Sequence, residues 1–414
     1  MEIRAQRLRR GDPGFRRASL AIFAAGVATF MLLYAPQPML AAMARDFGVS
    51  PASSTLTVAV STTMLALALL PAGWLSNACG RTQVIGLGLF AAAVLGLAAS
   101  AAPTFEALLV LRALQGVASA GVPAVAMAYL AEEIDPSSLG SSIGLYIGGN
   151  ALGGMSGRLL SGWLAEIGDW RLALVGVGVV SLACAVVFWR LAPPSRHHTR
   201  TRFTPAAALA AVTVHLQDRG QRLLAVMAAL LSGTFVAVYN ALGFRLVEAP
   251  YRLSAVAIGA IFLVYPIGSV SSAVAGRMAD VVGRRRLLPA GVLVTFAGIA
   301  LTTLSPLPVI VLGVALFTLG FFAAHSIASS WVGRRAHTSH AQASALYLIG
   351  YYAGSSVFGP LGGLAWSAGR WPAVTALATL LLTIAFAISL RLRATPPLAR
   401  PCSTTSAAAH ALTA

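Results

Sequence analysis

Two arginines stand inside apolar runs, where burying a guanidinium costs at least about 2.5–3.5 kcal/mol unless it faces a polar cavity or a partner. The first, Arg112, shares one predicted helix face with Gln115 and Ser119, at i+3 and i+7. This spacing suits a cation that lines a cavity and takes part in proton coupling. The alternative is an arginine whose long stem carries its charge to the outer interface.

The second, Arg158, follows a glycine-rich segment. Gly149, Gly153 and Gly157 form two successive GxxxG steps beside it, a spacing that lets two membrane helices pack closely. The guanidinium can attract an anionic or carbonyl-bearing substrate. It can equally extend outward toward the acidic residues that end the same apolar run, and the sequence leaves both roles open.

His325 is the third candidate, because an imidazole changes charge near neutral pH and can carry a proton. A neutral, hydrogen-bonded packing role is the alternative. None of the twelve acidic residues lies in the middle of an apolar run. The acidic candidates for proton transfer therefore lie near the ends of runs, at Asp46, Glu132, Glu133 and Glu248.

No metal or cofactor site is expected. The three cysteines are far apart, no H-E-x-x-H is present, and a phosphate-binding loop ending in lysine is impossible because the chain has no lysine. An enzyme or a receptor is therefore only a remote alternative to a transporter.

The elements that carry these residues are expected to be membrane-spanning helices. Apolar residues make up 57% and charged residues 10% of the 414-residue chain, whereas a soluble globule needs about 25% charged residues. About 20 apolar residues cross a bilayer, and a helix satisfies their backbone there. Twelve runs of about this length are present, at 19–40, 53–75, 84–101, 105–130, 139–165, 170–190, 223–246, 255–275, 287–304, 308–331, 341–366 and 370–391.

The basic residues set the expected orientation. All 29 are arginine, and 22 of them fall in the tails and connections of one side against 5 on the other. The positive-inside rule then places both termini in the cytoplasm. Because the arginines lie in short clusters between apolar runs, a nucleic-acid partner is not expected.

The chain divides into two related halves. Gly73 and Gly80 recur as Gly276 and Gly283 at an offset of 203 residues, which indicates an internal duplication. Paired halves with the substrate site between them are a recurring transporter design. The predicted divisions are a cytoplasmic tail at 1–18, a six-helix bundle at 19–190, a partly amphipathic linker at 191–221, a second six-helix bundle at 222–392 and a disordered tail at 393–414.

The segment 276–285 resembles the cytoplasmic loop motif of the major facilitator superfamily, and residues 112–116 resemble the fourth-helix motif of its proton-coupled members. The glycine-rich fifth run lies where twelve-helix drug:proton antiporters of the arabinose-efflux-like group carry a motif, but it lacks the usual proline before Gly153. The resemblance covers about 18–392. It implies an all-α polytopic membrane protein with twelve transmembrane helices in two pseudo-symmetric six-helix bundles.

The resemblance also implies which spans line the central cavity. Together with Arg112, Gln115, Arg158 and His325, the predicted substrate and proton pathway then contains Tyr34, Gln37, Asn150, Tyr239, Asn240 and Phe321. Aromatic side chains near few charges suit amphiphilic or lipophilic cargo. Helix packing is the alternative for each aromatic residue.

A cytoplasmic latch that holds the outward-open state is a further implication, with a plain arginine-rich turn as the alternative. The latch residues are Gly73, Asn77, Gly80, Arg81, Gly276, Asp280, Gly283, Arg284 and Arg285. Gly276 and Gly283 are expected where the backbone packs closely or adopts unusual dihedral angles. Because Asn77 replaces the acidic residue of the second loop, the latch of the first half is expected to be weaker.

These features predict secondary-active, proton-coupled efflux of a small organic molecule by a monomer in the bacterial inner membrane. Facilitated or symport uptake of a sugar or metabolite on the same fold is the alternative.

Overall fold

The computed structural model describes residues 7–195, 197, 213–336 and 340–395, except for the side chains at 280, 340 and 341. The helices of the first half are α1 (Pro13–Tyr34), η1 (Gln37–Met39), α2 (Leu40–Asp46), α3 (Pro51–Cys79), α4 (Arg81–Ser100), α5 (Phe105–Ser119), α6 (Gly121–Glu133), α7 (Pro136–Ile167) and α8 (Trp170–Leu191). Those of the second half are α10 (Arg219–Val247), α11 (Ala255–Ile261), η2 (Phe262–Val264), α12 (Tyr265–Met278), η3 (Ala279–Gly283), α13 (Arg284–Leu301), α14 (Leu307–Arg335) and α15 (His340–Ala394).

Nine helical segments among the described residues are long and apolar enough to cross a membrane. The predicted fifth and ninth spans, α7 and α13, are helical but do not count among the nine. The longest, α15, holds the predicted eleventh and twelfth spans, because its backbone leaves the helical region at Gly369 and at Arg370, where φ is 56°. Divided there, and with α7 and α13 included, the described helices form the twelve predicted segments.

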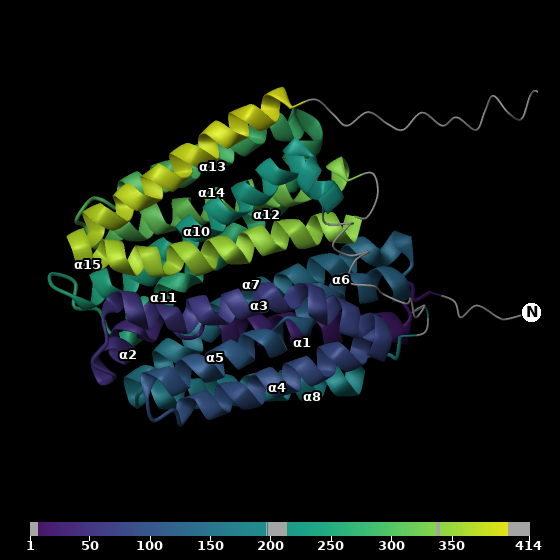
Figure 1. Ribbon diagram of the computed structural model, residues 1–414, viewed down its shortest axis with the longest axis horizontal. Coiled ribbons are helices and arrows are strands. Elements are labelled where there is room, and N and C mark those ends of the chain that lie inside the picture. The colour runs from purple at the N-terminus through teal and green to yellow at the C-terminus, as the bar shows by residue number, and fades with distance from the viewer. Residues whose placement is uncertain (1–6, 196, 198–212, 337–339, 396–414) are drawn as a thin grey trace, which may run out of the picture.

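The two halves lie side by side in Figure 1, with α1–α8 on one side and α10–α15 on the other. The start of α1 and the end of α15 lie at the same end of the bundle in Figure 1, which we call the terminal end; the other is the opposite end. The predicted linker falls mostly on 198–212, outside the described residues, and within it 213–217 is helical.

Glycines allow the closest helix contacts within each half. A Cβ built on Gly153 of α7 would lie 2.2 Å from the Val27 carbonyl oxygen of α1, and one built on Gly354 of α15 would lie 2.0 Å from the Ala229 carbonyl oxygen of α10. Gly149 and Gly157 meet α1 in the same way. The close packing predicted from the GxxxG steps is confirmed.

The halves contact each other toward the opposite end. The Glu166 carboxylate of α7 accepts a hydrogen bond of 3.0 Å from the Ala255 N–H at the start of α11. A Cβ on Gly162 or on Gly363 would meet backbone atoms of the other half within 2.7 Å. Toward the terminal end, by contrast, a Cβ on Gly144 of α7 meets no atom within 4 Å.

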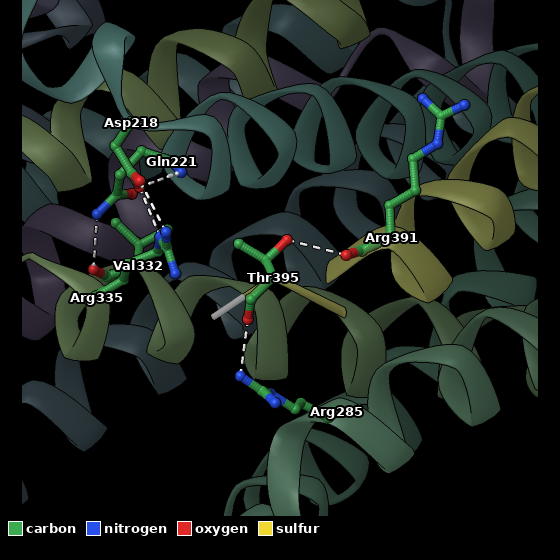
Figure 2. Close-up of polar contacts among 7 residues, drawn as sticks. All are labelled: Asp218, Gln221, Arg285, Val332, Arg335, Arg391 and Thr395. Carbon is green, nitrogen blue, oxygen red and sulfur yellow. Dashed lines mark hydrogen bonds and ion pairs between the residues drawn. The ribbon is translucent and has the colours of Figure 1, made fainter. Parts of the chain in front are cut away.

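Ion pairs join helix ends at the terminal end. Figure 2 shows the guanidinium of Arg335, at the end of α14, donating to both carboxylate oxygens of Asp218 at 2.6 and 2.8 Å. Asp218 also caps α10 by accepting from the Gln221 N–H. Burial alone would raise the pKa of the Asp218 carboxyl, but these hydrogen bonds hold that pKa below its ordinary value.

Replacing Gly153 by valine should prevent the close contact of α1 with α7. We expect a loss of about 1–3 kcal/mol, the usual cost of overpacking, seen as a lower melting temperature in detergent. Gly148→Val is the matched control, because a Cβ at Gly148 meets no atom within 4 Å. Equal melting temperatures for the two variants would contradict the packing described above.

Replacing Asp218 by asparagine should lower the stability at pH 7 by about 1–2 kcal/mol through loss of the charge-assisted bonds. Because the pKa is lowered in the folded state, the carboxylate contributes above its ordinary pKa of about 3.9 and loses that contribution as the pH falls through the lowered value. The difference should therefore shrink in acid, measured as melting temperature against pH. Asp169→Asn, at a helix cap where the carboxylate accepts a bond from the Leu172 N–H, should show a much smaller difference at pH 7.

Candidate substrate pathway

The first crossing segment is interrupted between α1 and α2. Pro36 has no N–H to donate to the Leu32 carbonyl, so α1 ends at Tyr34 and its last regular bond runs from the Ala35 N–H to the Met31 carbonyl. The chain continues as the short η1, in which Met39 N–H donates to Pro36 at 2.9 Å. Carbonyl groups at the break therefore need donors from neighbouring helices, since lipid supplies none.

Arg112 of α5 supplies most of these donors. Its Nη1 and Nη2 donate to the carbonyls of Leu32 and Leu33 at 2.9 and 2.8 Å, and its Nε donates to Thr57 of α3 at 2.8 Å. Nη1 also donates to the Gln115 side chain, which in turn donates to α4 at 3.0 Å. The side chain is 1% exposed. It reaches neither the outer interface nor an open cavity, because the helix break itself is its partner.

Arg158 of α7 lies near mid-depth. It is nine residues from Ile167, or about 14 Å at the rise of an α-helix, close to half of a ~30 Å hydrocarbon core. Its Nε donates to the Gln37 side chain at 2.6 Å, and Nη1 donates to the Gly154 carbonyl. It does not extend outward to the acidic residues at the end of α7, since Gln37 and the surrounding rings hold it inside.

Three aromatic rings surround this guanidinium. Its central carbon lies 4.7 Å from the ring centre of Tyr34, 4.6 Å from that of Phe262 and 4.8 Å from that of Tyr265. These distances allow cation–π attraction, which offsets part of the cost of burial. Because Tyr34 belongs to the first half and the other two rings to the second, Arg158 lies at the boundary between the halves.

Gln37 continues the network across this boundary. Its amide nitrogen donates to the Asn240 side-chain oxygen of α10 at 2.7 Å. The two residues are 203 apart, the offset of the duplicated loop glycines, so equivalent positions of the two halves meet here. Asn240 is fully buried, and its Nδ2 has no hydrogen-bond partner in the described part of the chain.

The other predicted pathway residues that join this network, Tyr239, Phe321 and His325, belong to the second half. The hydroxyl groups of Tyr239 and Thr318 share a hydrogen bond of 2.7 Å, and the Tyr239 ring stacks on that of Phe262. The His325 ring lies parallel to that of Phe321, and its Nδ1 is 2.9 Å from the Tyr347 hydroxyl. The structure thus brings Tyr34, Gln37, Arg158, Tyr239, Asn240, Phe321 and His325 into one connected region.

Three predicted members lie apart from it. Arg112 and Gln115 belong to the α1 break and contact α3 and α4. Asn150 lies two turns before Arg158 on α7, and its side-chain oxygen is buried without a partner in the described residues. Sequence reasoning missed Phe262 and Tyr265, for which the only signal was an aromatic residue in the eighth run.

The predicted latch residues lie at the terminal end. Gly80 and Gly283 have φ of 107° and 93°, so the expected unusual dihedral angles are confirmed for Gly283. Gly276 lies inside the helical segment α12, and a Cβ there meets no atom within 4 Å, so neither expected reason for glycine applies in this conformation. The same open space surrounds Gly73.

The arginines of the two loops donate hydrogen bonds to residues of their own half. Arg81 donates to Glu132 at 2.8 Å and to the Ser76 hydroxyl at 2.6 Å, and Arg284 donates to Ser330 at 3.2 Å. Arg285 donates to the Thr395 carbonyl (Figure 2). Asn77 lies in the last turn of α3, and the side chain of Asp280 is outside the described residues.

Comparison with known proteins identifies the family. Residues 20–273 match the family model of the Major Facilitator Superfamily. The chain belongs to this superfamily. It is a multi-pass membrane transporter and not an enzyme, in agreement with the fold and with the buried polar residues at its centre.

Two curated relatives match nearly the whole chain. The MFS-type transporter YybF of Bacillus subtilis is 45% identical over 382 residues, 92% of this chain and 95% of its own. The inner membrane transport protein YnfM of Escherichia coli is 43% identical over 387 residues, 94% of this chain and 93% of its own. The crystal structure of a bacterial homologue of the human lysosomal transporter Spinster, inward-facing and unoccupied, aligns with a TM-score of 0.77 at 16% identity, covering 93% of this chain and 98% of that one; this likeness concerns the fold alone.

Replacing Arg112 by lysine should lower the stability of the folded protein, because the contacts of Arg112 are structural. An ammonium cannot reach the three carbonyls that the planar guanidinium serves, and each one left without a donor costs about 1–3 kcal/mol. The measurement is the melting temperature in detergent. Arg171→Lys, at a partly exposed pair with Asp46, is the control and should lose at most about 1 kcal/mol. An Arg112→Lys protein of unchanged stability would contradict the structural role.

Proposed function

We propose that this chain moves a small organic molecule across the bacterial cytoplasmic membrane by alternating access and exchanges it for protons. The observation that carries the proposal is the Gln37–Asn240 bond beside the buried Arg158. It joins two related half-molecules over a polar site near mid-depth, toward the end where the halves contact each other. Rocking of the halves about such a junction opens the site to one side of the membrane at a time.

The arginine distribution supports a cytoplasmic terminal end, with both termini inside the cell. The described conformation then corresponds to the state that is open to the cytoplasm. In this assignment the latch residues act in the other state, when the terminal end closes. The open space around Gly73 and Gly276 supports this role of the latch, because a helix can approach these glycines when the terminal end closes.

His325 is the proposed proton carrier. The described acidic residues lie at helix ends or in connections, whereas His325 lies within α14, stacked on Phe321 of the central aromatic group. The Tyr347 hydroxyl, 2.9 Å from Nδ1, is a hydrogen-bond partner through which a proton can pass. Exchange of cargo for this proton supports export as the direction of transport.

The test uses energised inverted membrane vesicles and a fluorescent dye that reports the pH gradient. Cationic dyes, antibiotics, sugars and organic acids are added one at a time, to vesicles with the parent chain, with His325→Gln or with His215→Gln as the matched control. We expect one class to release protons in the parent and the control, and His325→Gln to move cargo without protons. Cargo flux down its gradient with no proton movement in the parent would contradict antiport and leave a facilitator.

A further inference from the structure

The centre of this transporter carries positive charge without an acid beside it. Arg112 and Arg158 are each 1% exposed, and no ion pair among the described residues includes either of them. The described acidic residues lie at helix ends or in the connections. Because an interior of low dielectric screens charge weakly, such a cation attracts an anion strongly.

The two arginines differ in how far their donors are used. All three nitrogens of Arg112 donate to protein oxygens, most of them backbone carbonyls. In Arg158 only Nε and Nη1 donate, to Gln37 and Gly154, and Nη2 makes no hydrogen bond with the described residues. Of the five N–H groups of a guanidinium, the described residues accept from four in Arg112 and from two in Arg158, so Arg158 keeps more donors for a ligand, including both of those on Nη2.

The surroundings of Arg158 suit a ligand with an apolar body. The rings of Tyr34, Phe262 and Tyr265 surround its guanidinium. At Gly154, one turn before Arg158 on α7, a Cβ would lie 3.1 Å from Nη1 and 3.8 Å from the Tyr265 ring, so any larger residue would crowd the guanidinium.

A second donor lies at the same junction. Asn240 points its oxygen at Gln37, which leaves its Nδ2 buried without a partner among the described residues. Gly359 of α15 corresponds to Arg158 at the offset of 201 residues that relates Gly153 to Gly354, and a Cβ on it would lie 3.4 Å from this nitrogen. The second half thus has no second cation here, and the junction offers one positive charge and one neutral amide donor.

We propose that Arg158 is the anion-binding group of the transport site and that the cargo is a small monocarboxylate with an aromatic or similarly apolar body. The carboxylate accepts hydrogen bonds from the guanidinium, and the apolar body packs against the surrounding rings. A single buried cation matches a single negative charge. This assignment rests on the proposed transport function and names the class of its substrate.

The experiment measures binding of benzoate and of benzamide to the purified protein by isothermal titration calorimetry at pH 7.5. The two probes share a ring and differ in charge. We expect benzoate to bind and benzamide to bind at least about ten-fold more weakly, a factor equivalent to about 1.4 kcal/mol. Arg158→Gln should weaken benzoate by a similar factor or more, and Arg45→Gln, at an exposed arginine near the opposite end, should not.

A second variant keeps the charge of Arg158, so that the test does not depend on the folding of Arg158→Gln. Gly154→Val places a side chain against Nη1 of Arg158 and should also weaken the binding of benzoate. Gly148→Val, whose Cβ meets no atom within 4 Å, should bind benzoate as the parent does. No benzoate binding to the parent, equal affinity for both probes, or unchanged affinity in Arg158→Gln would each overturn the proposal.

Vesicle flux separates this proposal from the proposed function. Benzoate that binds through Arg158 but neither crosses the membrane nor moves protons would support the anion site and contradict transport of this cargo. Flux of a cationic dye that is the same in the parent and in Arg158→Gln would support the transport function and contradict the anion site.

Discussion

The interruption of the first crossing segment is the constraint on which the rest of the site depends. Pro36 ends the regular helix, and hydrocarbon offers no water to the carbonyls that are left. Arg112 of α5 serves two of them, and the Ser161 hydroxyl of α7 donates to the Ala35 carbonyl at 2.8 Å. The break therefore fixes α1 against two neighbouring helices and places Gln37 in the interior, facing Arg158.

The Gln37–Asn240 bond between the halves is weak in a way that suits movement. Gln37 and Asn240 are neutral amides, and a hydrogen bond between neutral groups contributes only about 0.5–1.5 kcal/mol. Removing one partner of a buried ion pair, by contrast, costs about 3–5 kcal/mol because it leaves the other charge uncompensated. Since the single charge belongs to Arg158 and remains with the first half, the halves can part without separating opposite charges.

Much of the fold could be predicted from the sequence, and less of the site. Apolar runs located the twelve helical segments, and the glycine spacing predicted a close helix contact on α7 without naming α1 as the partner, because both follow from local composition. The role of Arg112 could not be predicted, since its partners are backbone carbonyls that carry no sequence signature. Phe262 and Tyr265 were missed because an aromatic residue in an apolar run looks the same whether it packs against lipid or against a guanidinium.

The central claim is that the two ends of the molecule open in alternation about the Gln37–Asn240 junction. The direct measurement is spin-label distance by double electron–electron resonance, between residues 166 and 255 at the opposite end and between residues 140 and 333 at the terminal end, across pH 5 to 9 and with added cargo. Alternating access predicts two populations in which the first distance lengthens as the second shortens. Distances that stay fixed, or that lengthen together, would contradict it.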